Sequence, residues 1–217
     1  ELPVGGLGTI KGVVTGLGNE RLGQVGITVA NIDGGASVST STGAGGVAAG
    51  TYEVTGLDVP GDYLVTYTLA DYAPRTEQVA LAFGDGGNIV TRNVTLDPNP
   101  GPVNGTVRTS TGSILAGAQV SLTDSEGDLF QDTTDANGDF SFDGVAAGTS
   151  TIEVTYTNGA SVGARTTSFV VPAGGGELAE PILVDVVTPT FEADGWEGPV
   201  SLLRVTMPDR PFIVDSI

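Results

Sequence analysis

The sequence predicts an all-β protein made of two tandem β-sandwich domains followed by a strand-rich C-terminal extension. Three observations predict this fold class: an internal repeat, apolar residues that alternate with period two, and glycine-rich turn signals at short spacing. No segment keeps the helical period of 3.6 residues over three turns. The repeat spans about 90 residues, which is the usual size of an immunoglobulin-like sandwich.

The internal repeat is visible as four blocks that recur in the same order in both halves of the chain. The first two blocks share one shift of 93 positions and need no gap between them. The paired blocks are residues 10–14 with 103–107, 22–29 with 115–122, 50–57 with 138–145, and 61–65 with 148–152.

The segments inside each repeat have the composition of strands. Residues 117–123 and 149–156 alternate between two faces and are rich in Thr, Val and Ile, which favour strands. Turn signals such as Asn137-Gly138 separate these segments. We therefore expect about seven strands in each repeat.

Proline marks the joint between the repeats, since Pro98, Pro100 and Pro102 end the last strand of the first repeat and stiffen the connection. The domains expected are a first sandwich over residues 1–98, a linker over 99–102, a second sandwich over 103–187, and an extension over 188–217. The extension is either a donated strand or the start of a third domain.

Charge restricts the partners of the chain. Its 26 acidic and 8 basic residues give a formal net charge of −18 and form no basic cluster, so neither nucleic acid nor an anionic membrane surface is expected to bind. No apolar run approaches the ~20 residues that span a bilayer, so membrane insertion is not expected. The acidity serves either solubility or a cationic partner, of which calcium is the most natural.

The composition also argues against catalysis. The sequence contains neither Cys nor His, which excludes disulfides, thiolate nucleophiles, zinc–thiolate sites and every Ser-His or Cys-His pair. Paired carboxylates are expected by chance in so acidic a chain, and aromatic residues that would grip a sugar substrate are few. We predict that the chain is not an enzyme and needs no cofactor.

The second repeat carries a recognisable pattern. Gly105, residues 115–120 (Leu-Ala-Gly-Ala-Gln-Val) and residues 134–142 (Thr-Asp-Ala-Asn-Gly-Asp-Phe-Ser-Phe) resemble the carboxypeptidase regulatory-like family. They are also similar to the Cna-B type repeats of bacterial surface proteins. The first repeat matches more loosely, with an expanded loop at residues 43–50. The resemblance implies a transthyretin-like, or prealbumin-like, sandwich.

The resemblance predicts the fold more specifically than it predicts the function. The family includes stalks, spacers, pilus subunits, adhesins and accessory domains of enzymes. It implies a secreted, extracellular or cell-surface protein. Cna-B relatives can carry a Lys–Asn isopeptide bond, for which Lys11 and Asn93 are the candidates. Lys11 is expected on the outer face of its strand, and Asn104 stands at its position in the second repeat. Both features disfavour the bond.

A second resemblance covers the last nine residues, 209–217, which are similar to a stretch in the non-catalytic part of large bacterial NAD-specific glutamate dehydrogenases. No nucleotide-binding or catalytic motif accompanies this stretch. It leaves the prediction of a non-enzymatic protein unchanged.

Two kinds of ligand site are open at this point. Asp124, Glu126 and Asp128 are candidate calcium ligands, although Asp is equally a turn residue of hairpins. Sugar rings stack on exposed aromatic faces, for which the candidates are Tyr63, Tyr67, Tyr72 and Trp196. Tyr63 and Tyr67 share a strand face, so a place in the core is the alternative.

The extension is the most suggestive part of the sequence for assembly. Its apolar residues either pair with an edge of their own domain, add to an edge of the next subunit, or begin a third domain. The candidate assembly residues are Leu202, Leu203, Val205, Phe212, Ile213 and Val214.

We predict an extracellular structural or adhesive protein, a stalk or fibre subunit assembled through β-strand edges. Its expected partners are other copies of itself or neighbouring surface proteins. The alternative is a glycan- or calcium-binding accessory module of a secreted protein.

Overall fold

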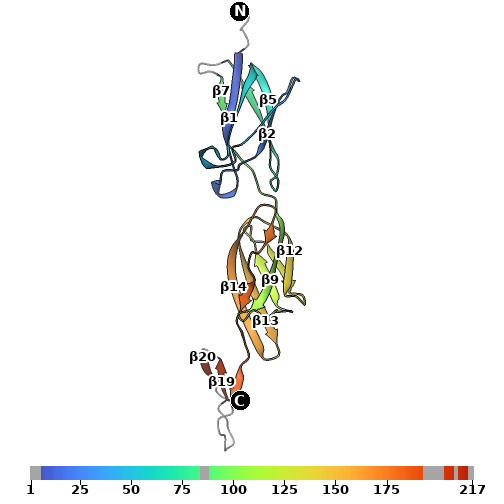
Figure 1. The fold of residues 1–217 in the computed structure, drawn as a ribbon, viewed down its shortest axis with the longest axis vertical. Coiled ribbons are helices and arrows are strands. Elements are labelled where there is room, and N and C mark those ends of the chain that lie inside the picture. Colours follow the sequence, from blue (N-terminus) through green and yellow to red (C-terminus); the bar gives the residue numbers. More distant parts are fainter. Residues whose placement is uncertain (1–5, 84–87, 193–202, 208–209, 215–217) are drawn as a thin grey trace, which may run out of the picture. The chain divides into compact units, whose positions relative to one another are not determined.

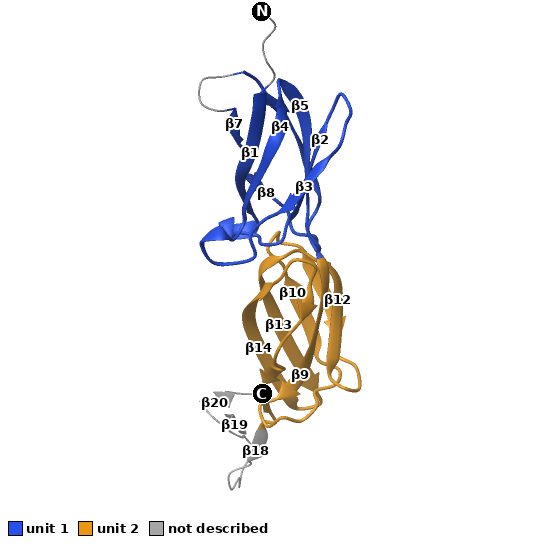
Figure 2. Ribbon diagram, turned by 45° about the horizontal axis from the view of Figure 1, so that its top comes forward, with its two compact units in different colours: residues 1–100 blue, residues 101–217 orange. Residues whose placement is uncertain are grey.

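The computed structural model describes residues 6–83, 88–192, 203–207 and 210–214, and nearly all its regular elements are strands (Figure 1). Two short 3-10 turns, Leu17–Asn19 and Gly46–Ala48, are the other elements. The chain divides into two compact units, residues 1–100 and residues 101–217 (Figure 2). The all-β fold class is confirmed. Within the described residues, no helix has the length and apolar character needed to cross a membrane.

The first unit is a sandwich of two sheets. One sheet has the order β3-β2-β5-β6, and the other has the order β4-β1-β7 with β8 also paired to β1. β1 runs antiparallel to β4 but parallel to β7 and β8. The strands are β1 (Gly6–Thr15), β2 (Gly26–Asn31), β3 (Val38–Ser41), β4 (Thr51–Val59), β5 (Gly61–Thr68), β6 (Arg75–Leu81), β7 (Ile89–Thr91) and β8 (Val94–Thr95).

The second unit repeats this arrangement. Its sheets have the orders β11-β10-β13-β14-β17 and β12-β9-β15, with β16 also paired to β9. The strands are β9 (Gly101–Thr109), β10 (Gln119–Thr123), β11 (Leu129–Thr133), β12 (Asp139–Val145), β13 (Gly148–Asn158), β14 (Ser161–Val171), β15 (Gly176–Glu177), β16 (Ile182–Val184) and β17 (Val186–Val187). Strands β9 to β16 thus correspond in order to β1 to β8, and β17 has no counterpart.

Because side chains alternate between the two faces of a strand, every second side chain points into the space between the sheets. In β5, for example, Tyr63, Val65 and Tyr67 are buried while Leu64 and Thr68 are exposed. Each unit has its own apolar core. The first is centred on Ile10, Val14, Val25, Ile27, Tyr52, Val65 and Tyr67, and the second on Val107, Val120, Leu122, Phe140, Phe142, Ile152 and Val154.

The two units follow each other closely along the chain. The N–H of Asn99 donates to the carbonyl of Asp71 at 2.8 Å, which ties residue 99 to the first unit. Gly101 already begins β9, where it pairs with Val145. Only Pro100 therefore lies between Asn99, which is bonded to the first unit, and Gly101, which begins the first strand of the second unit.

The extension forms its own antiparallel sheet in the order β18-β19-β20. Its strands are β18 (Thr190–Glu192), β19 (Leu203–Met207) and β20 (Arg210–Val214). Among the described residues, no ladder joins this sheet to a strand of the sandwich. Pairing with an edge of its own domain, one of the three arrangements considered above, is therefore not what the described backbone adopts. Leu202 lies outside the described residues.

Candidate functional site

The predicted calcium ligands lie in the turn between β10 and β11. The buried carboxylate of Asp124 accepts the backbone N–H groups of Glu126 at 3.0 Å, Asp128 at 2.9 Å and Ala146 at 3.1 Å. Burial alone would raise the pKa of Asp124, but these donors outweigh it and hold the pKa below its ordinary value. Asp124 thus closes the turn and ties it to the residue that follows β12.

Glu126 and Asp128 are exposed on that turn. Within the part of the chain that the structure describes, no group of three or more acidic side chains is arranged to hold a metal ion. Calcium binding by these three residues stays a prediction.

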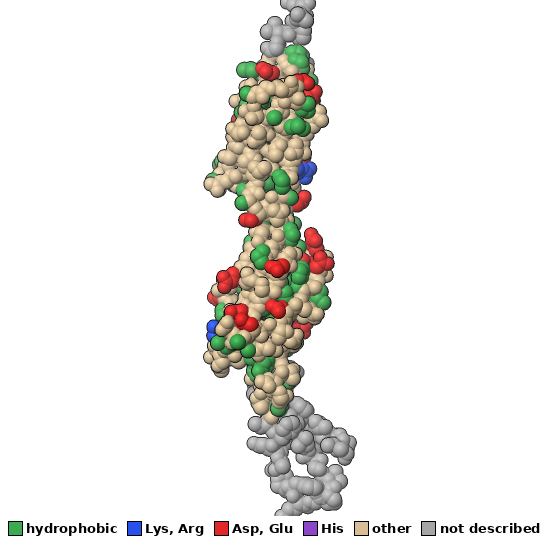
Figure 3. Space-filling model, turned by 90° about the vertical axis from the view of Figure 1, so that its right-hand side faces the viewer, with side chains coloured by type: hydrophobic (Ala, Val, Ile, Leu, Met, Phe, Trp, Pro, Cys, Tyr) green, Lys and Arg blue, Asp and Glu red, His purple; other side chains and the backbone are tan. Residues whose placement is uncertain are grey.

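A second acidic group lines a cavity of 570 Å³ in the second unit. Asp132, Asp135, Asp139 and Glu177 contribute to its wall. They come from β11, the β11–β12 turn, β12 and β15. Three of them lie close together in the sequence, and the fold brings Glu177 beside them. The spread of acidic side chains over the described surface is visible in Figure 3.

Two of these carboxylates are already used by the backbone. Asp132 accepts the Ser141 N–H at 2.9 Å, and Asp135 accepts the N–H groups of Asn137 at 2.8 Å and Asp139 at 2.9 Å. The Asp139 and Asn137 donors lower the pKa of Asp135 below its ordinary value. These aspartates therefore act as acceptors for the backbone at and beside the β11–β12 turn.

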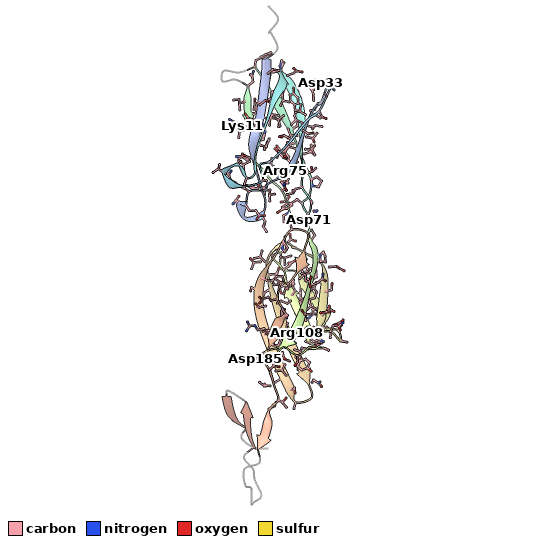
Figure 4. All side chains as sticks on the ribbon, in the orientation of Figure 1. Lys11, Asp33, Asp71, Arg75, Arg108 and Asp185 are labelled. Atoms are coloured by element: carbon pink, nitrogen blue, oxygen red, sulfur yellow. The ribbon has the colours of Figure 1, made fainter. Side chains whose placement is uncertain are left out.

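The corresponding cavity of the first unit, 430 Å³ in volume, is lined by Lys11, Glu53 and Asn93 among others. Lys11 lies opposite Glu53 in the β1–β4 register and is exposed (Figure 4). The side-chain oxygen of Asn93 accepts the Val13 N–H at 3.0 Å. The two residues named for an isopeptide bond thus line one cavity. An amine attacks only when uncharged, a form that burial favours, and Lys11 is not buried.

The tyrosines considered for sugar stacking are mostly core residues. Tyr63 is 4% exposed and Tyr67 is 0% exposed, so neither ring face is open to a ligand. Tyr72 is half-buried, and its hydroxyl donates to Glu20 at 3.1 Å. Trp196 lies outside the described residues. The alternation of strand β5 turns Tyr63 and Tyr67 inward, as the core alternative expected.

Strand β14 has a partly unpaired edge in the second unit. β17 pairs with β14 only at Val162 and Gly163, because residues 182–184 pair with β9 in the facing sheet. Two adjoining cavities of 410 and 360 Å³ lie beside the rest of this edge and share Phe169, Leu178 and Ala179. We call this pair of cavities the β14 groove.

Apolar side chains continue along the β14 groove. Val170 is 71% exposed and Leu183 is 51% exposed, and both line it. The groove therefore combines apolar side chains with charged ones, among them Arg165 and Glu180, beside a strand edge.

In the first unit, the corresponding edge strand carries an ion pair. Its edge strand β6 carries Arg75, which lies 2.9 Å from Glu77 and donates to the carbonyl of Thr95 beside it at 3.2 Å. Arg165 and Thr167 occupy the corresponding positions of β14, so the carboxylate of this bridge has no counterpart there.

Two family models match the chain. Residues 102–180 match the carboxypeptidase regulatory-like domain, the resemblance carried by residues 105, 115–120 and 134–142. The second sandwich carries this family's pattern. The predicted resemblance is thereby confirmed.

Residues 175–217 match the ACT1 domain of glutamate dehydrogenase. This match includes the nine C-terminal residues noted above, and it begins well before them. Its first part, residues 176–187, forms β15, β16 and β17, which belong to the second sandwich.

Solved structures similar to the chain include two pilins. The Bacillus anthracis TIE protein is 19% identical, with a TM-score of 0.43 over 83% of this chain and 34% of that chain. The streptococcal ancillary pilin is 19% identical, with a TM-score of 0.37 over 83% of this chain and 62% of that one. The Lactobacillus rhamnosus GG shaft pilin SpaA is 16% identical, with a TM-score of 0.34 over 82% and 97%.

This chain thus spans about a third of the TIE chain and less than two thirds of the ancillary pilin. A search of curated protein sequences finds no significant match.

Proposed function

We propose that this chain is an extracellular, cell-surface structural protein, a stalk or fibre subunit that assembles through β-strand edges and performs no catalysis. Its partners are other copies of itself or neighbouring surface proteins. The tandem architecture supports this proposal, because two sandwiches with separate cores follow each other with one residue, Pro100, between them.

The observation that carries the proposal is the β14 groove. An edge strand presents a row of N–H and C=O groups that pair readily with another strand. Along β14 this row begins after Gly163, where the ladder with β17 stops, so an added strand would continue an existing ladder. Apolar side chains of that strand would cover Phe169 and Leu178 in the groove.

The extension is the second element that we assign to assembly. Its register pairs Phe191 with Val205, Val205 with Phe212, and Leu203 with Val214, so these five apolar positions share one face of the sheet. A three-stranded sheet gains stability by covering an apolar face. Ile213 lies opposite Arg204, at positions that belong to the other face.

Negative-stain electron microscopy of the purified chain, with and without calcium, tests the proposal. We expect filaments that are lost in Leu183→Lys, which places a charge in the groove at a half-exposed position. Leu129→Lys is the matched control, because Leu129 is 63% exposed on β11 at the opposite edge of the same sheet. Circular dichroism verifies that both variants fold.

Single molecules at all concentrations would overturn the fibre proposal. If the Leu129 variant loses filaments and the Leu183 variant keeps them, the assembly contact is at the β11 edge and not at the β14 groove. A monomer that binds calcium or a glycan saturably would favour the accessory module instead.

A further inference from the structure

The first and last strands of each sandwich lie side by side and run parallel. In the first unit, residues 9–11 of β1 pair with 89–91 of β7, and residues 14–15 pair with 94–95 of β8. In the second unit, β9 pairs in the same way with β15 and β16. The start of β1 and the end of β8 are therefore at opposite ends of one ladder.

This geometry decides how tension acts on the unit. When the two chain ends of a parallel pair are pulled apart, one strand slides along the other and all the hydrogen bonds between them are loaded together. When an antiparallel pair is pulled from one end, the bonds break one after another. We infer that each sandwich is a shear clamp, and that a buried Tyr67–Tyr52–Arg92 hydrogen-bond chain locks the clamp of the first unit. The inference rests on the proposed stalk or fibre role, in which the chain carries tension.

The lock lies where the last strand of the first unit is interrupted between β7 and β8, at Arg92 and Asn93. The Arg92 N–H still donates to the Lys11 carbonyl at 2.8 Å. The Arg92 carbonyl, however, turns toward Gly12, where an added Cβ would lie only 1.7 Å from its oxygen. Glycine at position 12 is what allows this approach.

The turned carbonyl meets a partner from the core. It accepts the Tyr52 hydroxyl at 2.9 Å, and Asn93 bridges the interruption by accepting the Val13 N–H at 3.0 Å. Two side chains therefore form hydrogen bonds across the interruption. Asn93 comes from the last strand itself, and Tyr52 comes from β4.

The hydrogen-bond chain continues into the facing sheet. The hydroxyls of Tyr52 and Tyr67 lie 2.8 Å apart, and because Tyr52 donates to Arg92, Tyr67 donates to Tyr52. The two rings pack edge to face with centroids 5.7 Å apart. Burial raises the pKa of both tyrosines, so both hydroxyls remain protonated donors at neutral pH. The last strand is in this way anchored through β4 to β5.

The second unit has the clamp without this lock. Phe140 lies opposite Gly105 as Tyr52 lies opposite Gly12, and Val154 lies opposite Val120 as Tyr67 lies opposite Ile27. Neither Phe140 nor Val154 has a hydroxyl. Both hydroxyls of the lock are therefore specific to the first unit.

Single-molecule force spectroscopy on the full chain tests both parts. Because the sequence has no cysteine, introduced cysteines choose the pulling points. Leu7→Cys with Asp97→Cys loads the ladder between β1 and β8 in shear. Leu7→Cys with Asp58→Cys peels β1 from β4, because residues 7 and 58 are partners at one end of that antiparallel pair. We expect a clearly higher rupture force in the first geometry.

Tyr52→Phe tests the lock in the shear geometry. We expect its unfolding rate at fixed force to rise about tenfold, the effect of losing ~1.4 kcal/mol from the barrier. Thr42→Val is the matched control, since Thr42 is buried in the same unit away from the ladder. It should lower thermal stability with a smaller effect on the rate under force.

Equal rupture forces in the two geometries would overturn the clamp. A Tyr52→Phe rate no higher than that of the Thr42 control would overturn the lock. Filament formation is scored separately by microscopy, so a clamp without filaments and filaments without a clamp are distinct results.

Discussion

At the scale of single residues, positions that recur between the repeats make recurring contacts. An added Cβ at Gly12 would lie 3.1 Å from the Tyr52 ring, and one at Gly105 would lie 2.6 Å from the Phe140 ring. The buried hydroxyls of Thr42 and Thr134 make the same pair of bonds in the two units. Thr42 donates to the Leu22 carbonyl at 2.7 Å and accepts the Val25 N–H at 2.9 Å. These contacts explain why the glycines and threonines recur.

Replacement of Thr134 by Val tests the value of this hydroxyl. Thr134 donates to the Leu115 carbonyl at 2.7 Å and accepts the Ala118 N–H at 2.9 Å. The Val variant keeps the shape but leaves both backbone groups without this partner, so we expect a loss of about 1–3 kcal/mol in the free energy of unfolding. Urea denaturation measures it, with Thr133→Val at the exposed neighbouring position as control. Equal stability of the two variants would contradict the assignment.

Ser150 shows the opposite situation. It is 1% exposed in β13, and its hydroxyl has no hydrogen-bond partner among the described residues. Tyr63 occupies the corresponding position of the first unit and donates to the Asp58 carbonyl at 2.8 Å. The serine hydroxyl is buried without such a compensating bond.

We expect Ser150→Ala to stabilise the second unit by about 1 kcal/mol, because an unsatisfied buried hydroxyl is removed. A shift of the denaturation midpoint to higher urea at unchanged slope measures the gain. A lower midpoint would show that the hydroxyl has a partner, such as a buried water.

At the scale of elements, Asp124 joins the β10–β11 turn to the residues after β12. Its folded-state pKa is below its ordinary value, so its contribution to stability is complete above the pKa of the unfolded chain, about 4. That contribution is lost as the pH falls through the lower folded-state pKa. We expect Asp124→Asn to destabilise the second unit at pH 7 and to reduce the loss of stability on acidification. Melting temperatures measured from about pH 6 down to about pH 2 test this, and a variant as acid-sensitive as the parent would contradict it.

Much of each element follows from the sequence, and the exceptions have physical reasons. Alternation predicted the strands, and it turned Tyr63 and Tyr67 inward. Alternation does not predict which strand edge stays unpaired, because that depends on where the chain crosses from one sheet to the other. In the second unit the crossing is at Asp185, between β16 and β17, and it leaves part of the β14 edge unpaired. The acceptor role of Asp124 was likewise hidden, because Ala146 donates to it from 22 positions away. A turn aspartate and a calcium ligand look alike in sequence.

At the scale of the whole molecule, two cores and a separate sheet make the chain modular. Each sandwich buries its own apolar cluster, and the described strands of the extension pair with one another alone. The candidate assembly residues 203, 205 and 212–214 belong to β19 and β20. The stability of the sandwiches and the proposed assembly through the extension are open to separate tests.

Deletion of residues 188–217 is the test that follows from this modularity. Because no described ladder joins β18–β20 to the sandwich, we expect calorimetry of the shortened chain to show both sandwich transitions with little change in midpoint. We expect filament assembly to be lost, because the extension supplies the apolar positions 203, 205, 212 and 214. Loss of the second transition would show that the extension belongs to the second core. Filaments that survive the deletion would leave the β14 groove as the contact and remove the extension from the assembly.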